Sequence, residues 1–517
     1  MTLARRWPVT ATTLAASLVA LALGWRGVDF PAQILRIERF REGELLWNGN
    51  WYGGHPTLGY SVLLPAVGAL LGVTSLAVLT TTGSVAAFEA LVRRHPRGRR
   101  AAGAFAIGML ANLVVGRLAF ALGTAFALLA LLALQRSPAA AAVLAAAAGL
   151  SSPLAGVFLA IGVAAWGLHH RRPRAAAAVC AGAVGPAAAV SFLFGAGGSF
   201  PFGATTLLWT LALCAVVVVA TEEPVVRIGC ALYAAACLGA FAVNSPLGAN
   251  VGRLAMLVTA PLVLLADPAR VRRIVLAVPV VVGWHALQIT QAASAVASDP
   301  SAEREYHEGV VEFLRGLPQP VRVEIPFTRN HWETAYVASE IPIARGWERQ
   351  VDRELNPEFY DEERPLDAAR YEAWLRRNGV THVALPDVAF DGSSRREAEL
   401  VRGGLPYLEP VYRDENWTVF VVRTSSGIVV GDAAVLEMDD DHVVLDVGAA
   451  GDTMLRVRES PLWYVAQGDA CIDATADGWL RVSARVPGRI ELRQRVDVLR
   501  VIEGDTDTCA GPPGDGG

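Results

Sequence analysis

The first 300 residues alternate long apolar runs with short polar turns, which predicts a bundle of membrane helices. A span needs about 20 apolar residues, and fewer when helices pack within a bundle. The run 57–73, TLGYSVLLPAVGALLGV, is interrupted by Pro65 and is predicted to lie at the membrane surface. The other runs predict about eleven spans, near residues 8–25, 74–92, 101–115, 118–135, 138–152, 154–168, 175–195, 204–220, 225–243, 252–266 and 273–292.

From about residue 300 the long apolar runs end, and the hydrophobic residues follow the spacing of amphipathic helices and strands, as in a globular domain. SAEREYHEGVVEFLRGL and PLDAARYEAWLRRNG have helical spacing, whereas VRVEIPF and VTHVALP alternate like strands. YLEPVYRDENWTVFVVR predicts a hairpin that turns at residues 414–416. We therefore expect a transmembrane domain over 1–298 with a first external loop at 26–73, and an α/β domain over 299–424. A β-sandwich-like module should follow over 425–510, with a disordered tail at 511–517.

Composition and charge separate the same two halves. The chain has 517 residues, 53% of them hydrophobic and 18% charged, and its mean hydropathy of +0.37 is typical of a polytopic membrane protein. Residues 1–300 hold 21 arginines and 9 acidic residues, a net charge of +12, while the remainder has a net charge of −16. A weakly basic membrane half thus precedes an acidic, polar half, and we expect no nucleic-acid partner.

The arginines predict the orientation. With the N-terminus in the cytoplasm, fifteen of the arginines in the first 300 residues fall inside and six outside, as the positive-inside rule requires. An odd number of spans then places residues 300–517 outside the cytoplasm. The basic start of residues 1–24 also fits a cleaved signal peptide, but the missing A-x-A site and the many later spans favour an uncleaved first helix.

Two of the six cysteines, Cys471 and Cys509, lie in the polar half. Outside the cytoplasm they predict a disulfide that pins the C-terminal tail, whereas in a cytosolic domain they would be two free thiols. The other four lie in apolar runs, where a buried thiol needs no special role.

The polar stretch after the first span, GWRGVDFPAQILRIERFREGELLWNGNWYGGHP, contains Asp29. Asp29 stands two residues before Pro31 at the start of a helical pattern, so one interpretation is that it caps that helix. A cap also fixes the position of a carboxylate, so this interpretation leaves a chemical role open.

The order of these features resembles the GT-C membrane glycosyltransferases. DFPAQILRIERF, WNGNWYGGHP and YSVLLP, at residues 29–65, look like a bacterial branch of GT-C-like polytopic proteins. The resemblance covers roughly residues 8–135 and is architectural beyond them. It implies a sugar donor carried on a polyprenyl phosphate, an envelope glycan, lipid or protein as acceptor, and Asp29 as the general base.

The resemblance also implies cationic groups for the lipid phosphate. Arg117 and Arg253 stand alone at predicted outer ends of spans, where an arginine is costly unless it is paired, snorkelling or functional. Arg36 shares a helical face with Asp29. The predicted substrate-binding residues are Arg36, Trp51, Tyr52, His55, Arg117, Asn250 and Arg253.

Alternatives remain at several of these positions. Trp51, Tyr52 and His55 would stack on a sugar or bind phosphate, or else belong to an interfacial aromatic belt. The sequence shows no zinc-ligand spacing and no phosphate-binding glycine loop. Acidic partners for Asp29 are limited to Glu38, Glu42 and Glu44, so no metal is assigned, although a divalent cation stays open.

Two rival functions compete with a transferase. A flippase or envelope-assembly factor with a GT-C-like fold would need no general base, and the scarcity of external acids in the membrane half favours it. A transporter would be expected to carry ionisable residues at span centres, which are almost free of them. The distinctive stretch ARGWERQVDRELNP, at residues 344–357, either recognises an acceptor or docks the external domain.

Overall fold

The computed structural model describes residues 6–195, 197–271, 299–496 and 498–503, together with Gly283, Ala286, Thr290, Thr508 and Cys509. The predicted span at 273–292, apart from three isolated positions, and the predicted tail at 511–517 lie outside these residues. The chain divides into two compact units. Unit 1 combines Met1–Ile37 with Gly59–Ser298, and unit 2 combines Glu38–Leu58 with Asp299–Gly517.

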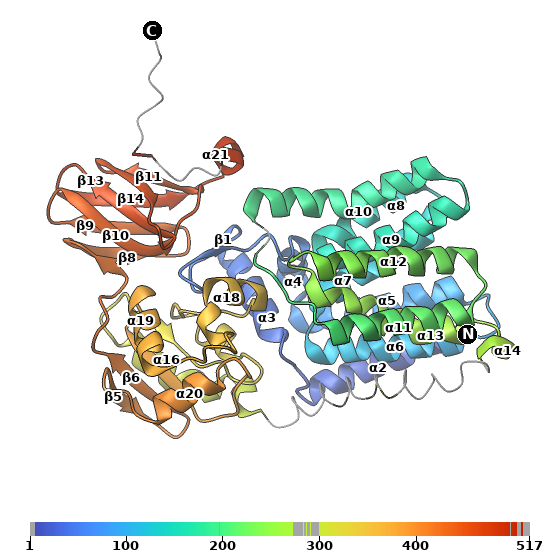
Figure 1. The fold of residues 1–517 in the computed structure, drawn as a ribbon, viewed down its shortest axis with the longest axis horizontal. Coiled ribbons are helices and arrows are strands. Elements are labelled where there is room, and N and C mark those ends of the chain that lie inside the picture. The colour runs from blue at the N-terminus through green and yellow to red at the C-terminus, as the bar shows by residue number, and fades with distance from the viewer. Residues whose placement is uncertain are drawn as a thin grey trace, which may run out of the picture. The chain divides into compact units, whose positions relative to one another are not determined.

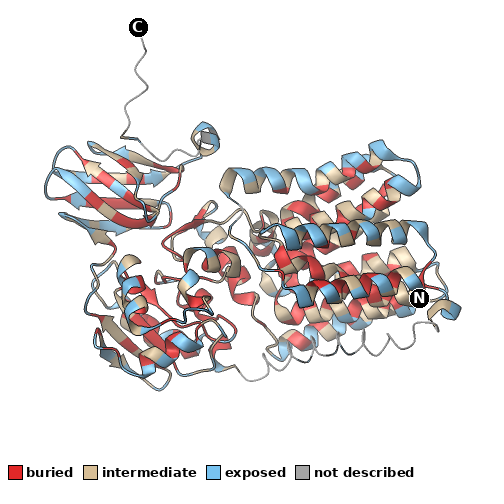
Figure 2. Ribbon diagram, viewed as in Figure 1, coloured by how far each residue is buried: buried red, intermediate tan, exposed pale blue. Residues whose placement is uncertain are grey.

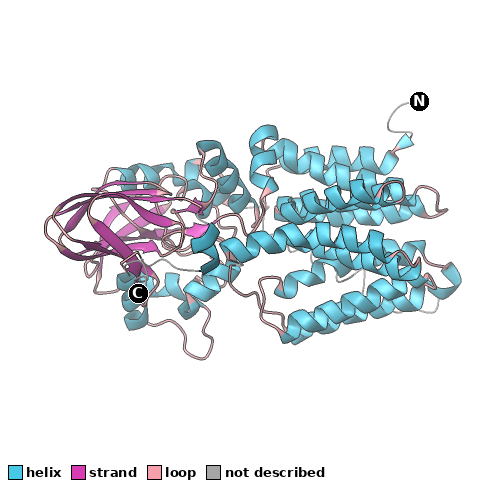
Figure 3. Cartoon of the chain, turned by 90° about the horizontal axis from the view of Figure 1, so that it is seen from above, coloured by secondary structure: helices cyan, strands magenta, loops and turns pink. Residues whose placement is uncertain are grey.

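Unit 1 is helical throughout its described length, with its helices running alongside one another (Figures 1 and 3). Ten of the eleven predicted spans coincide with helices, and the predicted surface run 57–73 contains only a short helix. The helices are α2 (Pro8–Ala22), the first part of α3 (Phe30–Glu42), α4 (Leu63–Leu71), α5 (Val73–Val92), α6 (Gly98–Val115), α7 (Leu118–Leu134), α8 (Pro138–Ser151), α9 (Pro153–His169), α10 (Pro173–Phe194), α11 (Ala204–Ala220), α12 (Pro224–Ala242), η1 (Gly248–Gly252), α13 (Arg253–Leu265) and α14 (Pro268–Val271).

Several of these helices suit a membrane by length and composition. Four are long and apolar enough to cross one: Val73–Val92, Pro173–Phe194, Pro224–Ala242 and Gly248–Leu265. Five shorter apolar helices accompany them, at Pro8–Ala22, Leu118–Leu134, Pro138–Ser151, Pro153–His169 and Ala204–Ala220. The chain is therefore a multi-pass membrane protein.

Small side chains line the interface between α8 and α10. Ala141, Ala145 and Ala148 of α8 are fully buried, as is Ala183 of α10. Lipid is as apolar as a leucine side chain, so helices in a membrane associate through close packing, which small residues permit. The buried residues accordingly follow the inward faces of the bundle, while the outward faces of α10 and α12 are largely exposed (Figure 2).

The α/β part of unit 2 contains a four-stranded sheet of order β3-β4-β6-β5, in which β3 and β4 are parallel and the other pairs antiparallel. The hairpin predicted around residues 414–416 is present as β5 and β6. The elements are η3 (Pro300–Ala302), α16 (Glu305–Arg315), β3 (Val323–Glu324), α17 (Glu333–Tyr336), α18 (Arg349–Leu355), η4 (Pro357–Phe359), α19 (Ala368–Arg377), β4 (His382–Pro386), α20 (Arg395–Arg402), β5 (Leu408–Arg413) and β6 (Trp417–Val422).

Two antiparallel sheets form the β-rich part of unit 2, with strand orders β12-β13-β10-β7 and β11-β14-β9-β8. Leu455, Ile472 and Leu480 of the first sheet share one buried core with Leu445 and Leu492 of the second. The elements are β7 (Val429–Val430), β8 (Ala433–Met438), β9 (His442–Val447), β10 (Gly451–Arg458), β11 (Trp463–Gln467), β12 (Ala470–Ala474), β13 (Trp479–Ala484), β14 (Gly488–Gln494) and α21 (Val498–Glu503).

A buried arginine organises the stretch 344–357. Arg345 is 1% exposed, and its guanidinium lies 2.7 Å from Asp352, 3.3 Å from Glu397 and 3.6 Å from Glu324. Burying a charge is costly unless it is paired, and here three acidic side chains surround one cation, although burial raises the pKa of Glu324 well above its ordinary value. Trp347 stacks on the ring of His331, with 3.5 Å between the ring centroids. Most of this stretch therefore serves the internal packing of unit 2.

The end of the first polar loop belongs to unit 2. Residues 38–58 include the paired strands β1 (Trp47–Asn48) and β2 (His55–Pro56). Trp51 is fully buried, donates from Nε1 to the Thr334 carbonyl at 3.1 Å, and lies against the backbone of Gly346. The predicted loop 26–73 is thus divided, with its beginning and end in unit 1 and its middle in unit 2.

The predicted disulfide joins Cys471 of β12 to Cys509, 38 residues later. Four cysteines are free: Cys180, Cys214, Cys230 and Cys237. We expect alkylation of the denatured, unreduced protein to label four cysteines, and alkylation after reduction to label all six. Mass spectrometry of the labelled peptides measures both numbers. Six labelled thiols without reductant would contradict an oxidising location for unit 2.

Truncating Trp51 should destabilise unit 2. We expect Trp51→Ala to lower its unfolding free energy by about 3–5 kcal/mol, because it leaves a large cavity. Trp51→Phe keeps an aromatic ring and loses the hydrogen bond to Thr334, so its cost should be about 1 kcal/mol. Limited proteolysis of the purified full-length chain at increasing urea concentration measures both, and equal resistance of Trp51→Ala and wild type would disprove the anchoring role.

Candidate functional site

The turn between α6 and α7 places Arg117. Gly116 adopts a left-handed conformation with a φ of 92°, and its N–H donates to Leu113 O while the N–H of Arg117 donates to Asn112 O. This pair of bonds is the Schellman motif that ends many helices at a glycine. The side-chain amide of Asn112 also donates to Arg117 O at 3.3 Å. Arg117 therefore leaves a well-defined turn immediately before α7.

The segment before α3 lies directly against this turn. The N–H of Gly27 donates to Val114 O at 2.8 Å, and that of Asp29 donates to Val115 O at 2.9 Å. A Cβ atom on Gly27 would lie 2.5 Å from Val114 O, and one on Gly116 would lie 2.4 Å from the nitrogen of Phe30. Two glycines thus allow the two backbones to meet, and the contact brings Asp29 to Arg117.

Asp29 and Arg117 form an ion pair within unit 1. The Nε atom of Arg117 lies 3.5 Å from Oδ2 of Asp29, and the two side chains are 30% and 22% exposed. The carboxylate is therefore partly accessible from outside the protein. The sequence predicted both residues as site members but, because 88 residues separate them, could not predict that they touch.

Arg253 joins the pair from a third part of the chain. It begins α13 directly after the 3-10 turn η1, whose Val251 carbonyl accepts a hydrogen bond from the Tyr233 hydroxyl at 2.6 Å. The same hydroxyl accepts from the N–H of Ala255 at 3.3 Å, so Tyr233 ties the turn to the helix. Arg253 interacts electrostatically with Asp29 and Arg117. Asn250, another predicted site residue, lies within η1, where its N–H donates to Leu247 O.

Tyr60 is a residue that the sequence analysis did not select. The guanidinium carbon of Arg36 lies 4.0 Å from the centroid of its ring, in a cation–π contact. Tyr60 also has a weaker, longer-range electrostatic influence on Arg253. It stands at the start of YSVLLP, where a tyrosine near an apolar run looks like an interfacial aromatic and gives no distinct signal.

The backbone around Tyr60 is fixed by the end of α8. The hydroxyl of Ser61 donates to Ser151 O at 2.6 Å, and the N–H of Val62 donates to Leu150 O at 2.9 Å. Ser61 Oγ in turn accepts from the N–H of Leu64 in the first turn of α4 at 3.2 Å. The ring of Tyr60 therefore extends from a segment whose next two residues are hydrogen-bonded to the end of α8.

The remaining aromatic candidates lie inside unit 2. Trp51 and Tyr52 are 0% and 1% exposed, and His55 is 7% exposed. The Tyr52 hydroxyl donates to Gly346 O at 2.5 Å, and His55 Nε2 lies 3.3 Å from Glu348 Oε1. The rings of Trp51 and His55 stack on each other. Neither a sugar face nor a membrane interface is available to buried rings, so in this structure the three residues serve as packing anchors.

Glu38, Glu42 and Glu44 also belong to unit 2. Glu38 lies 4.0 Å from Arg304, and Glu42 lies 3.1 Å from Arg39. Burial, and then the carboxylates of Asp440 and Asp441, raise the pKa of Glu44 to about 7.

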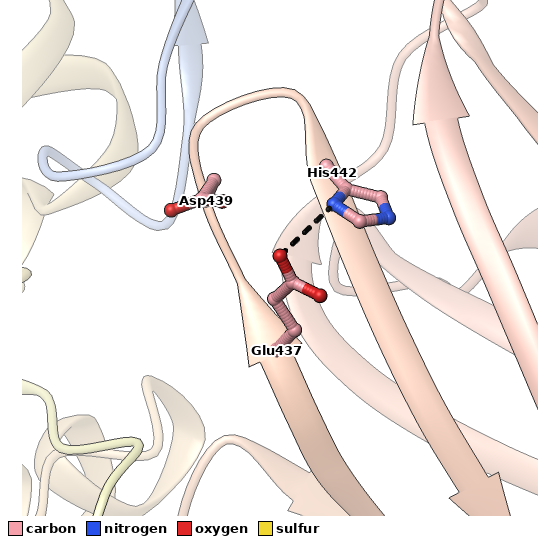
Figure 4. A group of neighbouring side chains, drawn as sticks. All are labelled: Glu437, Asp439 and His442. Atoms are coloured by element: carbon pink, nitrogen blue, oxygen red, sulfur yellow. Dashed lines mark ion pairs between the residues drawn. The ribbon is translucent and has the colours of Figure 1, made fainter.

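One group of side chains in the described part of the chain has ligand atoms close enough for a cation. Glu437, Asp439 and His442 lie beside the β8–β9 turn, and their ligand atoms are within 4.8 Å of one another (Figure 4). The two acids are exposed, and His442 Nε2 lies 3.2 Å from Glu491. Carboxylate and imidazole groups suit a divalent cation, but exposed groups of this kind are common at hairpin turns.

Comparison with solved structures finds chains of similar fold. No family model matches the chain, and no curated protein matches it in sequence. The cryo-EM structure of the arabinofuranosyltransferase AftD from Mycobacteria is similar, with 17% sequence identity and a TM-score of 0.46. The similarity covers 87% of this chain and 41% of that chain, so the present chain spans less than half the length of AftD. A fold does not by itself determine an activity, and none is assigned from this likeness.

Proposed function

We propose that the chain is a GT-C-type membrane glycosyltransferase that moves a sugar from a polyprenyl-phosphate donor to an acceptor of the cell envelope outside the cytoplasm. The observation that carries the proposal is the meeting of Asp29 with Arg117 at 3.5 Å, with the charge of Arg253 acting on both at longer range. The resemblance of residues 29–65 to GT-C-like sequences supports the same function. An acid beside several cations suits a reaction that removes a proton and releases a phosphate.

In the proposed reaction Asp29 is the general base. An acceptor hydroxyl attacks the anomeric carbon of the donor sugar, and the Asp29 carboxylate takes the hydroxyl proton. The bond from the anomeric carbon to the phosphate oxygen breaks, and its electron pair leaves with the lipid phosphate. The partial exposure of the Asp29 side chain, at 22%, allows such an approach.

The arginines stabilise the departing phosphate. Guanidinium groups bind phosphate oxygens through paired hydrogen bonds, and this binding strengthens as negative charge develops on the leaving group. Arg117 pairs with Asp29, the charge of Arg253 acts on both at longer range, and Arg36 lies over the ring of Tyr60. We assign the phosphate to these residues, and the lipid tail to the apolar helices that carry them.

The proposed orientation has the N-terminus in the cytoplasm and unit 2 outside it. The arginine distribution supports it, and so does the disulfide between Cys471 and Cys509, since such bonds persist in oxidising compartments. The acceptor would then be an envelope glycan, glycolipid or protein.

A non-catalytic GT-C-like protein, such as a flippase or envelope-assembly factor, is the second candidate. The observation that favours it is the same ion pair, because an aspartate that only compensates an arginine needs no chemistry. Substitution of the aspartate separates the two functions.

Asp29→Asn should abolish transfer while preserving the fold. The amide keeps the size of the side chain but is no longer a base, and loss of a general base typically slows a reaction by about 10²–10⁴-fold. We expect envelope glycan and glycolipid profiles of the host to match those of a deletion strain when the variant is present at the normal level. Asp469→Asn removes an exposed carboxylate of unit 2 and is the control. Full rescue of the deletion by Asp29→Asn would favour the non-catalytic function.

Arg117→Gln should impair donor use, whereas Arg136→Gln should not. The two arginines flank opposite ends of α7, at Leu118–Leu134, so the pair controls for the charge lost from that helix. Removing one charge-assisted contact to phosphate should weaken binding of the lipid phosphate by about tenfold or more. Binding of polyprenyl phosphate to the purified chain in detergent measures the change. Equal losses in both variants would contradict the assignment of Arg117 to the phosphate.

A further inference from the structure

Two arginines of unit 2, Arg322 and Arg458, lie over the ring of one tryptophan, and the charge of a third, Arg456, acts on Arg322. Arg322 precedes β3, Arg456 and Arg458 lie on β10, and Trp479 begins β13. The guanidinium carbons of Arg458 and Arg322 lie 3.9 Å and 5.7 Å from the centroids of the Trp479 ring system. We call these four residues the arginine–tryptophan cluster.

The positive charge of the cluster is met by carbonyl oxygens. Arg322 donates to Asn378 O at 2.8 Å and to Arg456 O at 2.6 Å. Arg458 donates to Tyr52 O and Asp477 O, both at 3.1 Å. The guanidinium of Arg456 donates to two further carbonyls and to the hydroxyl of Ser426. Among the described residues, no carboxylate oxygen comes within 4.0 Å of these three guanidinium groups.

Arg345 shows how the same unit buries an arginine that has a structural role. Arg345 and Arg322 are both 1% exposed. Arg345 has three carboxylates within 3.6 Å, whereas Arg322 has only neutral acceptors. A buried cation without an anion is costly because carbonyl dipoles replace only part of its hydration. The contrast indicates that the cluster lacks a negative partner.

Two buried donors of the cluster also lack an acceptor. Arg322 Nε and Trp479 Nε1 are buried and have no hydrogen-bond partner among the described residues. Both groups can only donate, and a buried donor without an acceptor costs about 1–3 kcal/mol. Burial, and then the guanidinium groups of Arg458 and Arg456, lower the pKa of Arg322 to about 9. Burial and Arg377 likewise lower the pKa of Arg458 to about 10.

The cluster approaches the surface beside the β12–β13 turn. Arg458 is only partly buried, and its bond to Asp477 O is exposed to solvent. The nearby acids, Asp477 and Glu459, have exposed side chains and interact with Arg458 at longer range. Water screens the charges of these exposed acids, so Asp477 and Glu459 do not neutralise the buried positive charge of Arg322. An anion entering here would meet Arg458 first.

We propose that the arginine–tryptophan cluster is a binding site for an oxyanion, either a phosphate or a carboxylate group. Such groups accept several hydrogen bonds at once and match the planar fork of a guanidinium. The anion supplies acceptors for the donors of Arg322 and Trp479 and neutralises the three arginines. It is either a free inorganic ion or an acidic group carried by a sugar. The site does not depend on the proposed transferase activity.

Equilibrium dialysis of the purified full-length chain with radiolabelled inorganic phosphate tests the proposal. We expect saturable binding in which sulfate or glucuronate competes and chloride at equal ionic strength does not. Arg458→Gln should weaken phosphate binding by about tenfold or more, because it removes a charged donor from the accessible side. Trp479→Phe keeps one aromatic ring and removes the indole N–H together with part of the ring surface, so a smaller loss of about three- to tenfold is expected.

Two controls keep the result specific. Arg495→Gln removes an arginine that stacks on Tyr464, outside the cluster, and should leave phosphate binding unchanged. Arg117→Gln removes charge from unit 1, and binding lost only in that variant would overturn the proposal. So would the absence of saturable binding, or equal binding by wild type, Arg458→Gln and Trp479→Phe. Stronger competition by glucuronate than by sulfate supports a sugar acid, and the reverse order supports a phosphoryl group.

Discussion

The close approach of two backbones, at Gly27 and Gly116, is the constraint on which the candidate site depends. A side chain at either position would collide with the opposite backbone, because its Cβ atom would lie only 2.5 Å (Gly27) or 2.4 Å (Gly116) from a main-chain atom. The approach sets Asp29 beside Arg117 in an apolar bundle, where each charge reduces the cost of the other. The Asp29–Arg117 pair needs this close approach whether its role is catalytic or structural. The two roles differ in whether a substrate reaches the Asp29 carboxylate.

The first polar loop contributes to both units in different ways. Its start supplies Asp29 and Arg36 to unit 1, while its middle supplies Trp51 and Tyr52 to the interior of unit 2. The glycine- and aromatic-rich sequence WNGNWYGGHP is therefore explained by packing, because its rings fill unit 2 and two of its glycines, Gly53 and Gly54, have positive φ. A motif that looks like a sugar-binding platform is here a structural anchor.

Unit 2 buries its arginines in two contrasting ways. Arg345 is surrounded by carboxylates, and this arrangement holds the helices of the α/β part around one ionic centre. Arg322 is surrounded by carbonyl oxygens and an indole, and retains donors without acceptors. Arg322 and Arg345 are equally buried, so exposure to solvent does not explain why their hydrogen-bond partners differ. The difference lies in the surrounding groups, which are acidic side chains around Arg345 and neutral carbonyl oxygens around Arg322.

The sequence by itself determined the helical and β-rich halves, most helix positions in unit 1, the hairpin at residues 414–416 and the pairing of Cys471 with Cys509. These features follow from local periodicity, from composition, and from the small number of cysteines in the polar half. It also selected Asp29, Arg117 and Arg253, because isolated charges at the ends of apolar runs are unusual. Only the tertiary structure decided that Asp29 meets Arg117, that Arg36 lies over Tyr60, and that Trp51, Tyr52 and His55 are buried. Contacts between segments distant in the chain depend on helix packing and on close backbone approach, which no local pattern encodes.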